Sequence, residues 1–581
     1  MTAPTDTHLL LRAFVDELVR CGMRAACTSP GSRSTPLVLA LAREPRLRCY
    51  SHIDERCGGF FALGLAKACG APVAVACTSG TAAAELLPAV IEAHEARVPL
   101  LVLTADRPPE LRESGAGQTI DQIKLFGGAA KWFFEVGNHA ADEQRLRWMR
   151  TLACRAYGRA LEGRPGVVHI NFPLREPLFS DAPLPADATG RTNGQPYVSR
   201  PASRLASPPA LGALRELLGG ARRGVLVAGR DEHDTRLGEA AAAFCAAAGW
   251  PLLADPLSGA RRGQAAVAHY DALLRDRGFA AAMKPDLVLR VGDLPTSKPL
   301  RRWLAEQGQT PQAILDPDGA WQDPDAALAH SLALDPAPAL RELAQDARPA
   351  DGDWLSTWRS ADERAAEAIL GVLGAAGLSE PAVAAELGVL LPAEATLFVA
   401  SSMPVRDIES FWPVRADPPR VLCNRGANGI DGTVSSAFGA AAHDGGPVVL
   451  LIGDVALAHD IGGLLAHTRL ALDLTIVLLN NEGGGIFDFL PVASSRIARE
   501  GDVYTEHIAT PTGLDFAAAA TLYGLAYEQV GDVFAFRTAL ERSVEDGPQR
   551  RASIIEVRGE RAGNVELHCR LWQAVSAALS C

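Results

Sequence analysis

The sequence predicts an α/β fold made of three doubly wound parallel-sheet domains. Short apolar runs alternate with segments of helical periodicity along almost the whole chain, which favours parallel sheets with helices on both faces. With 581 residues, the chain is too long for one hydrophobic core. Two stretches rich in Pro, Ala, Gly and small polar residues, 181–210 and 344–354, divide it into three blocks.

The first block, residues 1–185, holds several strand candidates, each followed by a helical pattern. This order predicts a parallel sheet with crossover helices. After the first strand we expect a helix with Thr35 as its N-cap and Pro36 at its first position. The expected strands cover residues 23–29, 47–53, 72–80 and 98–106.

The other two blocks repeat this alternation. The central block, 205–350, has expected strands at 224–230, 251–255 and 286–293. The C-terminal block, 354–581, has them at 395–402, 420–426, 447–454, 474–481 and 551–559. We therefore expect one N-terminal, one central and one C-terminal α/β domain.

The composition is that of an ordinary globular enzyme. The net charge of −12 argues against a nucleic-acid or anionic-membrane partner, so an anionic substrate needs a local cluster of Arg or Lys. No signal peptide is recognisable, and no run approaches the roughly 20 apolar residues of a spanning helix. The eleven scattered cysteines include no CxxC pair and are expected to be reduced core thiols. A cytoplasmic protein is the expectation.

Two apolar strands of the C-terminal block end in oxygen-bearing side chains, Asp454 and Asn481, with 26 residues between them. Ligands of parallel sheets bind beyond the carboxyl ends of the strands. One carboxylate, one amide and the carbonyl of Gly483 suit Mg²⁺, whose other ligands can be phosphate oxygens. The alternative is that Asp454 is only a turn or N-cap residue.

This paired pattern resembles the thiamine diphosphate fingerprint, which implies metal ligation by Asp454, Asn481 and the Gly483 carbonyl. The sequence departs from the common form in Val455, which replaces a glycine, and in Glu482, which we expect to point away from the ion. Thiamine diphosphate also needs a carboxylic acid at N1′ of its aminopyrimidine. Glu55 is the candidate, at a strand-to-helix junction beside an apolar helix, where burial raises a carboxyl pKa. Alternatively, Glu55 only complements the helix dipole.

Six segments from the first and C-terminal blocks resemble the 2-succinyl-5-enolpyruvyl-6-hydroxy-3-cyclohexene-1-carboxylate synthase family of menaquinone biosynthesis, and the resemblance extends over all three blocks. The resemblance implies the thiamine diphosphate-binding decarboxylase type of fold. It also implies a transferase that decarboxylates 2-oxoglutarate and adds the resulting enamine to isochorismate. The segments are "TSPGSRSTPL", "HIDERCGGFFALGLAK", "TSGTAAAELLPAVIEA", "TADRPPEL", "NRGANGIDG" and "NNEGGGIFDFLP".

Both substrates are polyanions, so guanidinium groups at strand ends are the expected ligands. By resemblance, isochorismate contacts Ser32, Arg33, Arg107 and Gln118, while 2-oxoglutarate and its adduct contact Arg406 and Arg425. Lys298 of the central block is a further substrate-binding candidate. Each Arg taken alone is more often a surface charge, but four at strand ends inside matching motifs argue against chance. The residues that the resemblance makes catalytic are Glu55, Arg33, Gln118, Arg406 and Arg425.

The remaining cofactor contacts follow from the same resemblance. Ile430 is implied as the apolar wedge that bends the cofactor, with an ordinary core residue as the alternative. The other positions that line the cofactor are Ser402, Val455, Ala456, Ile486 and Phe487. The expected cofactors are thiamine diphosphate and Mg²⁺, with Mn²⁺ as a second ion.

Glu55 and the metal motif are about 400 residues apart, yet one cofactor must touch both. Related enzymes pair the two domains across a two-fold axis, which implies a homodimer, or a homotetramer built from two dimers. One competing function is that of another thiamine diphosphate carboligase or decarboxylase, similar to acetohydroxyacid synthase. A non-catalytic homologue is the other, although Glu55, Asp454 and Asn481 are all present.

Overall fold

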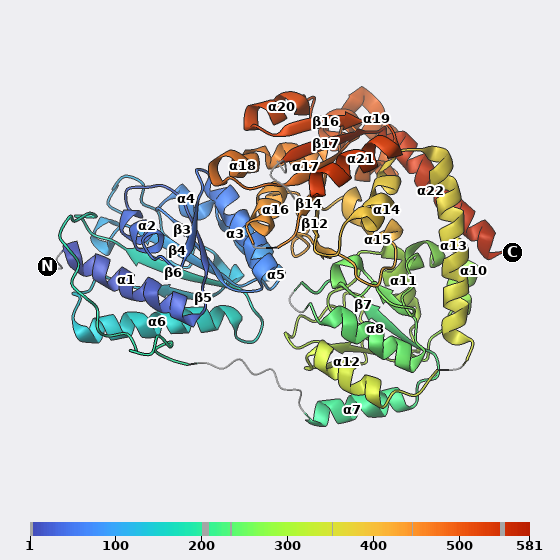
Figure 1. Ribbon diagram of the computed structural model, residues 1–581, viewed down its shortest axis with the longest axis horizontal. Coiled ribbons are helices and arrows are strands. Elements are labelled where there is room, and N and C mark those ends of the chain that lie inside the picture. The colour runs from blue at the N-terminus through green and yellow to red at the C-terminus, as the bar shows by residue number, and fades with distance from the viewer. Residues whose placement is uncertain are drawn as a thin grey trace. The chain divides into compact units, whose positions relative to one another are not determined.

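The computed structural model describes residues 4–199, 208–232, 235–350, 352–443, 445–545 and 552–580. Three sheets, all with parallel pairing, confirm the predicted fold class (Figure 1). By contacts between residues the chain divides into two compact units. The first unit comprises the described parts of 1–203, 424–444 and 459–472, and the second comprises those of 204–423, 445–458 and 473–581.

The first unit contains a six-stranded sheet in the order β2-β1-β3-β4-β6-β5. Its strands are β1 (Ala25–Thr28), β2 (Arg48–Ser51), β3 (Val73–Cys77), β4 (Leu100–Asp106), β5 (Ala130–Glu135) and β6 (Val167–Pro173). The first four lie where the apolar runs predict them. Its helices are α1 (Pro4–Cys21), α2 (Thr35–Ala42), α3 (Glu55–Cys69), α4 (Thr81–Ala84), α5 (Leu87–Glu95), α6 (Glu143–Leu161), α16 (Thr433–Ala441) and α18 (Leu465–Leu470).

The start of α2 corrects one detail of the sequence analysis. Thr35 is the first helical residue, and Ser34 is the N-cap. The Ser34 hydroxyl donates to the Gly31 carbonyl at 3.1 Å and caps no helical N–H, so neither hydroxyl acts in the expected way. The rigid backbone of Pro36, at the second helical position, still favours the helical conformation here.

The central feature of the first unit is the contact between α3 and α16. Their backbones approach so closely that a Cβ on Gly64 would lie 1.9 Å from the Ser436 carbonyl oxygen, and one on Gly439 would lie 2.1 Å from that of Phe61. Only glycine fits at these two crossing points. Residues 57–67 of α3 are all buried, so this helix is the core of the unit.

The second unit contains two sheets. The five-stranded sheet has the order β11-β10-β9-β7-β8, with β7 (Gly224–Ala228), β8 (Leu252–Ala254), β9 (Leu287–Val291), β10 (Gln312–Leu315) and β11 (His330–Leu332). The six-stranded sheet has the order β13-β12-β14-β15-β17-β16, with β12 (Thr396–Val399), β13 (Arg420–Leu422), β14 (Val448–Gly453), β15 (Thr475–Asn480), β16 (Ala526–Val530) and β17 (Ser553–Arg558).

One apolar core joins these two sheets, and α13 contributes a tryptophan cluster to it. Trp354 and Trp358 are buried there, and the Trp358 ring lies edge-on to Trp303 at 6.0 Å. The longer helices of this unit are α7 (Pro208–Gly219), α8 (Leu237–Ala248), α11 (Lys298–Glu306), α12 (Pro336–Gln345), α13 (Trp354–Ala376), α14 (Glu380–Leu390), α15 (Met403–Phe411), α20 (Phe516–Tyr523), α21 (Val533–Val544) and α22 (Arg561–Leu579). Short helices are α9 (Tyr270–Leu273), α10 (Arg277–Ala282), α17 (Asp454–His459) and α19 (Arg496–Arg499).

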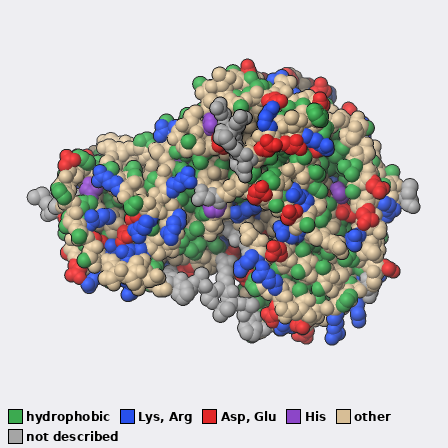
Figure 2. Space-filling model, viewed as in Figure 1, with side chains coloured by type: hydrophobic (Ala, Val, Ile, Leu, Met, Phe, Trp, Pro, Cys, Tyr) green, Lys and Arg blue, Asp and Glu red, His purple; other side chains and the backbone are tan. Residues whose placement is uncertain are grey.

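Within the described residues, no single helix is both long and apolar enough to cross a membrane, although α13 and α14 together, bent by 116°, meet the length and composition of a span. On the face shown in Figure 2, acidic and basic side chains are interspersed. The predicted linker, 181–210, is described at 181–199, where it forms no helix or strand, and at 208–210, which correct the prediction because they begin α7. Polar contacts hold part of it against α1 and α6, as in the donation from Arg20 to the Arg191 carbonyl at 2.8 Å.

Candidate active site

The carboxyl end of the first sheet brings several of the predicted residues together. Arg33 follows β1, Glu55 follows β2 and Arg107 follows β4. The Arg107 guanidinium donates to the Ser79 hydroxyl, just after β3. The Gln118 amide donates to the Ser79 carbonyl at 2.9 Å. These strand-end loops therefore form one polar surface.

Arg33 and Arg107 form a cationic pair at this surface. Arg33 is only 6% exposed; it donates to the Leu174 carbonyl at 2.8 Å and pairs with Glu176 at 3.1 Å. Its buried Nε has no hydrogen-bond partner among the described residues. Burial and the neighbouring Arg33 charge lower the pKa of Arg107. Two close guanidiniums and a spare buried donor suit a carboxylate ligand.

The loop of Gln118 is held tightly against β3. The Ser79 hydroxyl donates to the Gln118 carbonyl at 3.0 Å, and Gln118 itself has a positive φ of 56°. A Cβ on Gly80 would lie 3.1 Å from the Gln118 side chain, so a larger residue would push this loop away. Ser32, in contrast, is exposed before α2. The loop contacts fix Gln118 beside Arg107.

Glu55 is the first residue of α3 and is half-buried. The preceding Asp54 caps the helix by accepting from the Arg56 N–H at 2.9 Å, which leaves the Glu55 carboxyl outside this capping contact. Burial raises the pKa of Glu55, and the charges of Glu85 and Asp54 raise it further. A carboxyl group of raised pKa holds a proton more readily near neutral pH, as general acid–base chemistry requires.

The loop that carries Arg425 and Ile430 is anchored on α5. The carboxylate of Glu92 accepts from the Gly426 N–H at 2.8 Å and from the Ala427 N–H at 2.7 Å. Glu92 is 3% exposed, and the ammonium group of buried Lys67 lies 3.7 Å from it. This buried charge pair holds the backbone of the loop, while the Arg425 side chain stays partly exposed.

Ile430 is half-buried, although most isoleucines in this protein's sheets are fully buried. The same loop lines a hollow in the first unit together with Phe60, Leu87 and Ile91. Ile430 is therefore not part of the fully buried core, and its role as a cofactor contact stays a prediction.

In the second unit, β14 delivers Asp454 to a buried position at the start of α17. Asp454 is 2% exposed, and burial raises its pKa to about 6. Its carboxylate accepts from the Gly483 N–H at 2.9 Å. The turn after β15 is thereby brought to the end of β14, as the strand order predicts. The neighbours Val455 and Ala456 begin α17, half-buried and buried respectively.

Asn481 has the features of a metal ligand. Its amide nitrogen donates to the Glu380 carboxylate at 2.8 Å, which fixes the orientation of the amide. Its Oδ1 is buried and has no hydrogen-bond partner among the described residues. A buried polar atom without a partner is costly, and a cation at this oxygen would remove that cost. The adjacent Asn480 serves the fold instead, since its amide donates to Glu556 at 2.7 Å.

Gly483 has a φ of 136°, which favours glycine, and a Cβ there would lie 2.5 Å from the Ala509 carbonyl oxygen. Glu482 is exposed, and its expected orientation away from the ion stays a prediction. Arg561 of α22 donates to the Glu482 carbonyl at 2.8 Å. Ile486 and Phe487 follow in a short 3₁₀ helix (Gly485–Phe489), and both are partly exposed.

Ser402 and Arg406 lie at the start of α15, beyond β12. Ser402 has a φ of 74°, a strained conformation that costs a non-glycine residue on the order of 1–3 kcal/mol. Arg406 donates to the Ser402 carbonyl, so this hydrogen bond ties the guanidinium to the strained turn. Lys298 is exposed at the first residue of α11, on the central sheet.

Comparison with known proteins matches all three parts of the chain to thiamine pyrophosphate enzymes. Family profiles match at residues 10–125 (thiamine pyrophosphate enzyme, N-terminal TPP binding domain), 193–399 (middle domain of thiamine pyrophosphate) and 405–557 (thiamine pyrophosphate enzyme, C-terminal TPP binding domain). The 2-succinyl-5-enolpyruvyl-6-hydroxy-3-cyclohexene-1-carboxylate synthase of Chloroflexus aurantiacus is 44% identical over 577 residues, which cover 98% of this chain and 96% of the relative.

The chain belongs to this synthase family. The synthase of Geobacillus thermodenitrificans is also 44% identical, over 98% of this chain and 96% of its own length. That of Halobacterium salinarum is 42% identical, over 94% and 95% respectively. The predicted family, the α/β fold and the assignment as a thiamine diphosphate-dependent enzyme are therefore confirmed.

Sequence reasoning did not find three residues that hold the candidate site segments in place. They are Glu92, which anchors the loop of Arg425, Glu380, which orients Asn481, and Arg561, which binds the turn after Asn481. Each acts across a long stretch of sequence, so no local spacing marks it. The only local signal is the Ser379-Glu380-Pro381 pattern of a helix start, which carries no hint of a metal.

Proposed function

We propose that this protein is a cytoplasmic enzyme that decarboxylates 2-oxoglutarate and joins the remaining fragment to isochorismate, with thiamine diphosphate and Mg²⁺ as cofactors. The product is 2-succinyl-5-enolpyruvyl-6-hydroxy-3-cyclohexene-1-carboxylate, the compound for which its relatives are named. The observation that carries the proposal is similarity over nearly the full chain together with the cationic strand ends. The proposal also includes a division of the chain into three domains, 1–185, 205–350 and 354–581.

The residues of the second unit fit the diphosphate and its metal. Asp454 supplies a buried carboxylate, Asn481 a buried amide oxygen without a described partner, and Gly483 a backbone carbonyl. These are hard oxygen donors, as Mg²⁺ and Mn²⁺ prefer. Ser402, Val455, Ala456, Ile486 and Phe487 are proposed to line the rest of the cofactor, with Ile430 against its bend.

Thiamine diphosphate, when bound, supplies the carbon nucleophile and the electron sink that decarboxylation needs. The role proposed for Glu55 is to share a proton with N1′ of the aminopyrimidine. Its half-buried position supports that role, because burial raises its pKa and keeps the proton available.

The arginines are proposed to bind and orient the substrate carboxylates. Arg33 and Arg107 would hold isochorismate together with Ser32 and Gln118, and the unpartnered Nε of Arg33 is the donor left for it. Arg406 and Arg425 would hold 2-oxoglutarate, with Lys298 at the edge. Bidentate guanidinium contacts fix planar carboxylates in one orientation, which brings the reacting carbons together.

The active form is proposed to be a homodimer, or a homotetramer of two dimers, with the cofactor shared between subunits. The first unit exposes Ile53, two residues before Glu55, and Leu87 and Ile91 of α5, with side chains that are 56%, 37% and 39% exposed. In the second unit Leu490 and Ile497 are exposed beyond the metal motif. Apolar side chains next to a site support burial by a second subunit.

The test is turnover with 2-oxoglutarate and isochorismate, with thiamine diphosphate and Mg²⁺ each omitted in turn. The expected result is product formation that requires all four components. The competing function, a carboligase similar to acetohydroxyacid synthase, predicts that pyruvate is decarboxylated faster than 2-oxoglutarate. Decarboxylation of pyruvate alone would overturn the proposal.

A further inference from the structure

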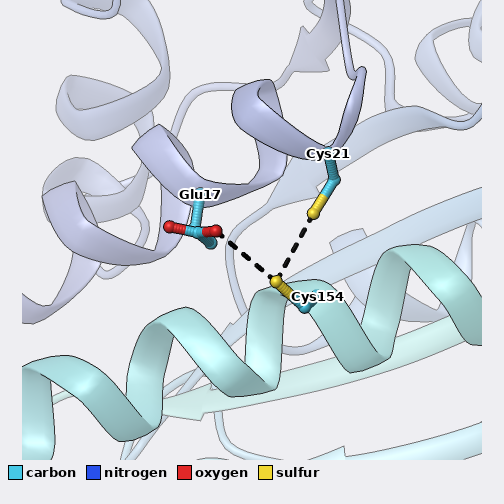
Figure 3. A group of neighbouring side chains, drawn as sticks. All are labelled: Glu17, Cys21 and Cys154. Carbon is cyan, nitrogen blue, oxygen red and sulfur yellow. Dashed lines mark hydrogen bonds between the residues drawn. The ribbon is translucent and has the colours of Figure 1, made fainter. Parts of the chain in front are cut away.

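Two thiols and a carboxylate meet in the first unit, away from the proposed catalytic residues (Figure 3). Cys21 is the last residue of α1, Glu17 lies one turn before it, and Cys154 is in the middle of α6. The sulfur atoms of Cys21 and Cys154 are 3.6 Å apart. Cys154 Sγ lies 3.5 Å from Glu17 Oε1, and the three side chains point toward one another.

A polar network surrounds these thiols. Arg150 of α6 donates to Glu17 at 2.8 Å and to Asp187 at 2.7 Å. The Tyr197 N–H donates to Glu17, and the Val198 N–H donates to Cys154 Sγ at 3.4 Å. Both carboxylate oxygens of Glu17 are thus engaged with the protein itself.

This environment disfavours a metal ion. Thiophilic cations such as Zn²⁺ take two thiolates and further N, O or S ligands, usually in a tetrahedron. Here Glu17 already pairs with the Arg150 guanidinium, which would repel a divalent cation a few ångströms away. A covalent bond between the sulfurs needs no such rearrangement of charge.

We propose that Cys21 and Cys154 are a site of reversible disulfide formation that responds to low-molecular-weight disulfides such as oxidised glutathione. The sulfurs have to close from 3.6 Å to about 2.05 Å. They come from two helices that cover the same face of the first sheet, so bond formation needs side-chain rotation rather than unfolding.

The reaction consists of two thiol–disulfide exchanges. Cys21 is partly exposed and Cys154 is buried, so the Cys21 thiolate attacks the small disulfide and releases one glutathione thiol. Cys154 then attacks the Cys21 sulfur and releases the second. One S–S bond forms, two protein S–H protons leave, and the small disulfide is reduced to two thiols. The hydrogen bond to Cys154 and burial raise the pKa of Cys21, which slows the first exchange. The Val198 N–H lowers the pKa of Cys154 and still favours its thiolate in the second exchange, after Cys21 has lost its thiol proton.

The bond joins α1 to α6 and closes a loop of 133 residues. A cross-link of this kind restricts the unfolded chain, so the oxidised protein should unfold at a higher temperature. It also removes the Cys154 thiol that now donates to Glu17. Oxidation therefore changes how the segment from Asp187 to Val198 is held.

The test uses the full-length protein equilibrated in buffers of graded oxidised-to-reduced glutathione ratio. Free thiols are then alkylated, and the protein is digested without reduction and analysed by mass spectrometry. We expect a linked peptide pair containing Cys21 and Cys154, and a higher Tm of the oxidised protein. Both should be absent in Cys21→Ser and in Cys154→Ser.

Cys569→Ser is the matched control, because it removes an exposed thiol on α22 and should leave the linked peptide unchanged. The proposal is overturned if wild type shows no linked pair, or if Cys21 only accumulates bound glutathione. It is also overturned if both thiols are protected by stoichiometric Zn²⁺ in the reduced protein. The wild-type peptide map decides the question even if a serine variant does not fold.

Discussion

At the scale of single residues, Glu55 carries the clearest expectation. The change Glu55→Gln keeps the shape of the side chain but removes the proton that the carboxyl shares. We expect normal folding and cofactor binding and a loss of turnover on the order of 10² to 10⁴-fold. Steady-state kinetics and a thiamine diphosphate titration measure the two effects. Glu85→Gln, an exposed neighbour whose charge raises the Glu55 pKa, is the control and should keep most activity.

Glu380 is the second residue whose role can be isolated, because it accepts from the Asn481 amide and leaves Oδ1 free. Removing a partner that orients a metal ligand typically lowers metal affinity about 10- to 100-fold. Glu380→Ala should weaken Mn²⁺ binding in the presence of thiamine diphosphate by that factor, measured from free Mn²⁺ by electron paramagnetic resonance. Glu380→Gln should retain most of the affinity, since its carbonyl still accepts.

Glu386, on the same helix and paired with Arg537 at 2.7 Å, provides the control for Glu380. Glu386→Ala should leave Mn²⁺ affinity unchanged. Equal affinities for wild type and Glu380→Ala would show that Asn481 is oriented without this contact. Glu380 lies 101 residues before Asn481, so its role could not be predicted from the sequence. Asp454 and Asn481 could be, because each directly follows a buried strand.

At the scale of elements, the anchored loop of Arg425 depends on α5. Glu92→Gln keeps one acceptor oxygen and loses the second, and it leaves the Lys67 charge without its partner. We expect a raised KM for 2-oxoglutarate, because Arg425 is less well placed, together with a lowered Tm. Glu95→Gln, an exposed change on the same helix, should alter neither value. An unchanged KM in Glu92→Gln would separate this anchor from substrate binding.

Strand β6 carries a further prediction, which concerns acid stability. Burial lowers the pKa of His169 to about 3, and burial together with the Arg469 charge lowers that of His52 to about 4. Both are neutral in the fold but take a proton below pH 6.5 when unfolded. Their contribution to stability is therefore present above pH 6.5 and is lost as the pH falls, at about 1.4 kcal/mol per pH unit and histidine.

Urea unfolding of the apoprotein between pH 5 and pH 7.5 measures this loss. The two histidines together should account for about 4 kcal/mol between pH 6.5 and pH 5. His169→Gln should reduce the pH dependence by about half of that amount, since one proton uptake is removed. An unchanged slope in this variant would mean that His169 is already charged in the folded protein.

The elements also show how far sequence patterns reach. Uniform apolar runs predicted β1, β3, β4, β14 and β15, because a strand that is buried on both faces consists almost entirely of apolar residues. No such run marks β6, where His169 and Asn171 are buried but hydrogen-bonded to Thr104, at 2.8 and 2.7 Å. Strand β5 is half-buried and β16 is polar, and neither stood out. Tertiary hydrogen bonds of this kind are not visible in a local pattern.

At the scale of the whole molecule, the shared-site proposal predicts complementation between two inactive variants. Glu55→Gln damages the first unit and Asp454→Ala the metal motif of the second. A mixed dimer would contain one doubly damaged site and one intact site. Co-expressed subunits with two different tags should recover up to half of the wild-type activity per dimer. If purified mixed dimers remain inactive, each site is built by a single subunit.

The packing of α16 against α3 has a consequence for synthesis on the ribosome. Helix α3 is complete at Cys69, but its partner begins only at Thr433, about 360 residues later. At a synthesis rate of about 5–20 residues per second, roughly 20 to 70 s pass before α16 exists to pack against the apolar, glycine-containing face of α3. During that interval the nascent chain presents a natural target for chaperones. A fragment that ends before residue 424 should for the same reason be recovered mainly in aggregates.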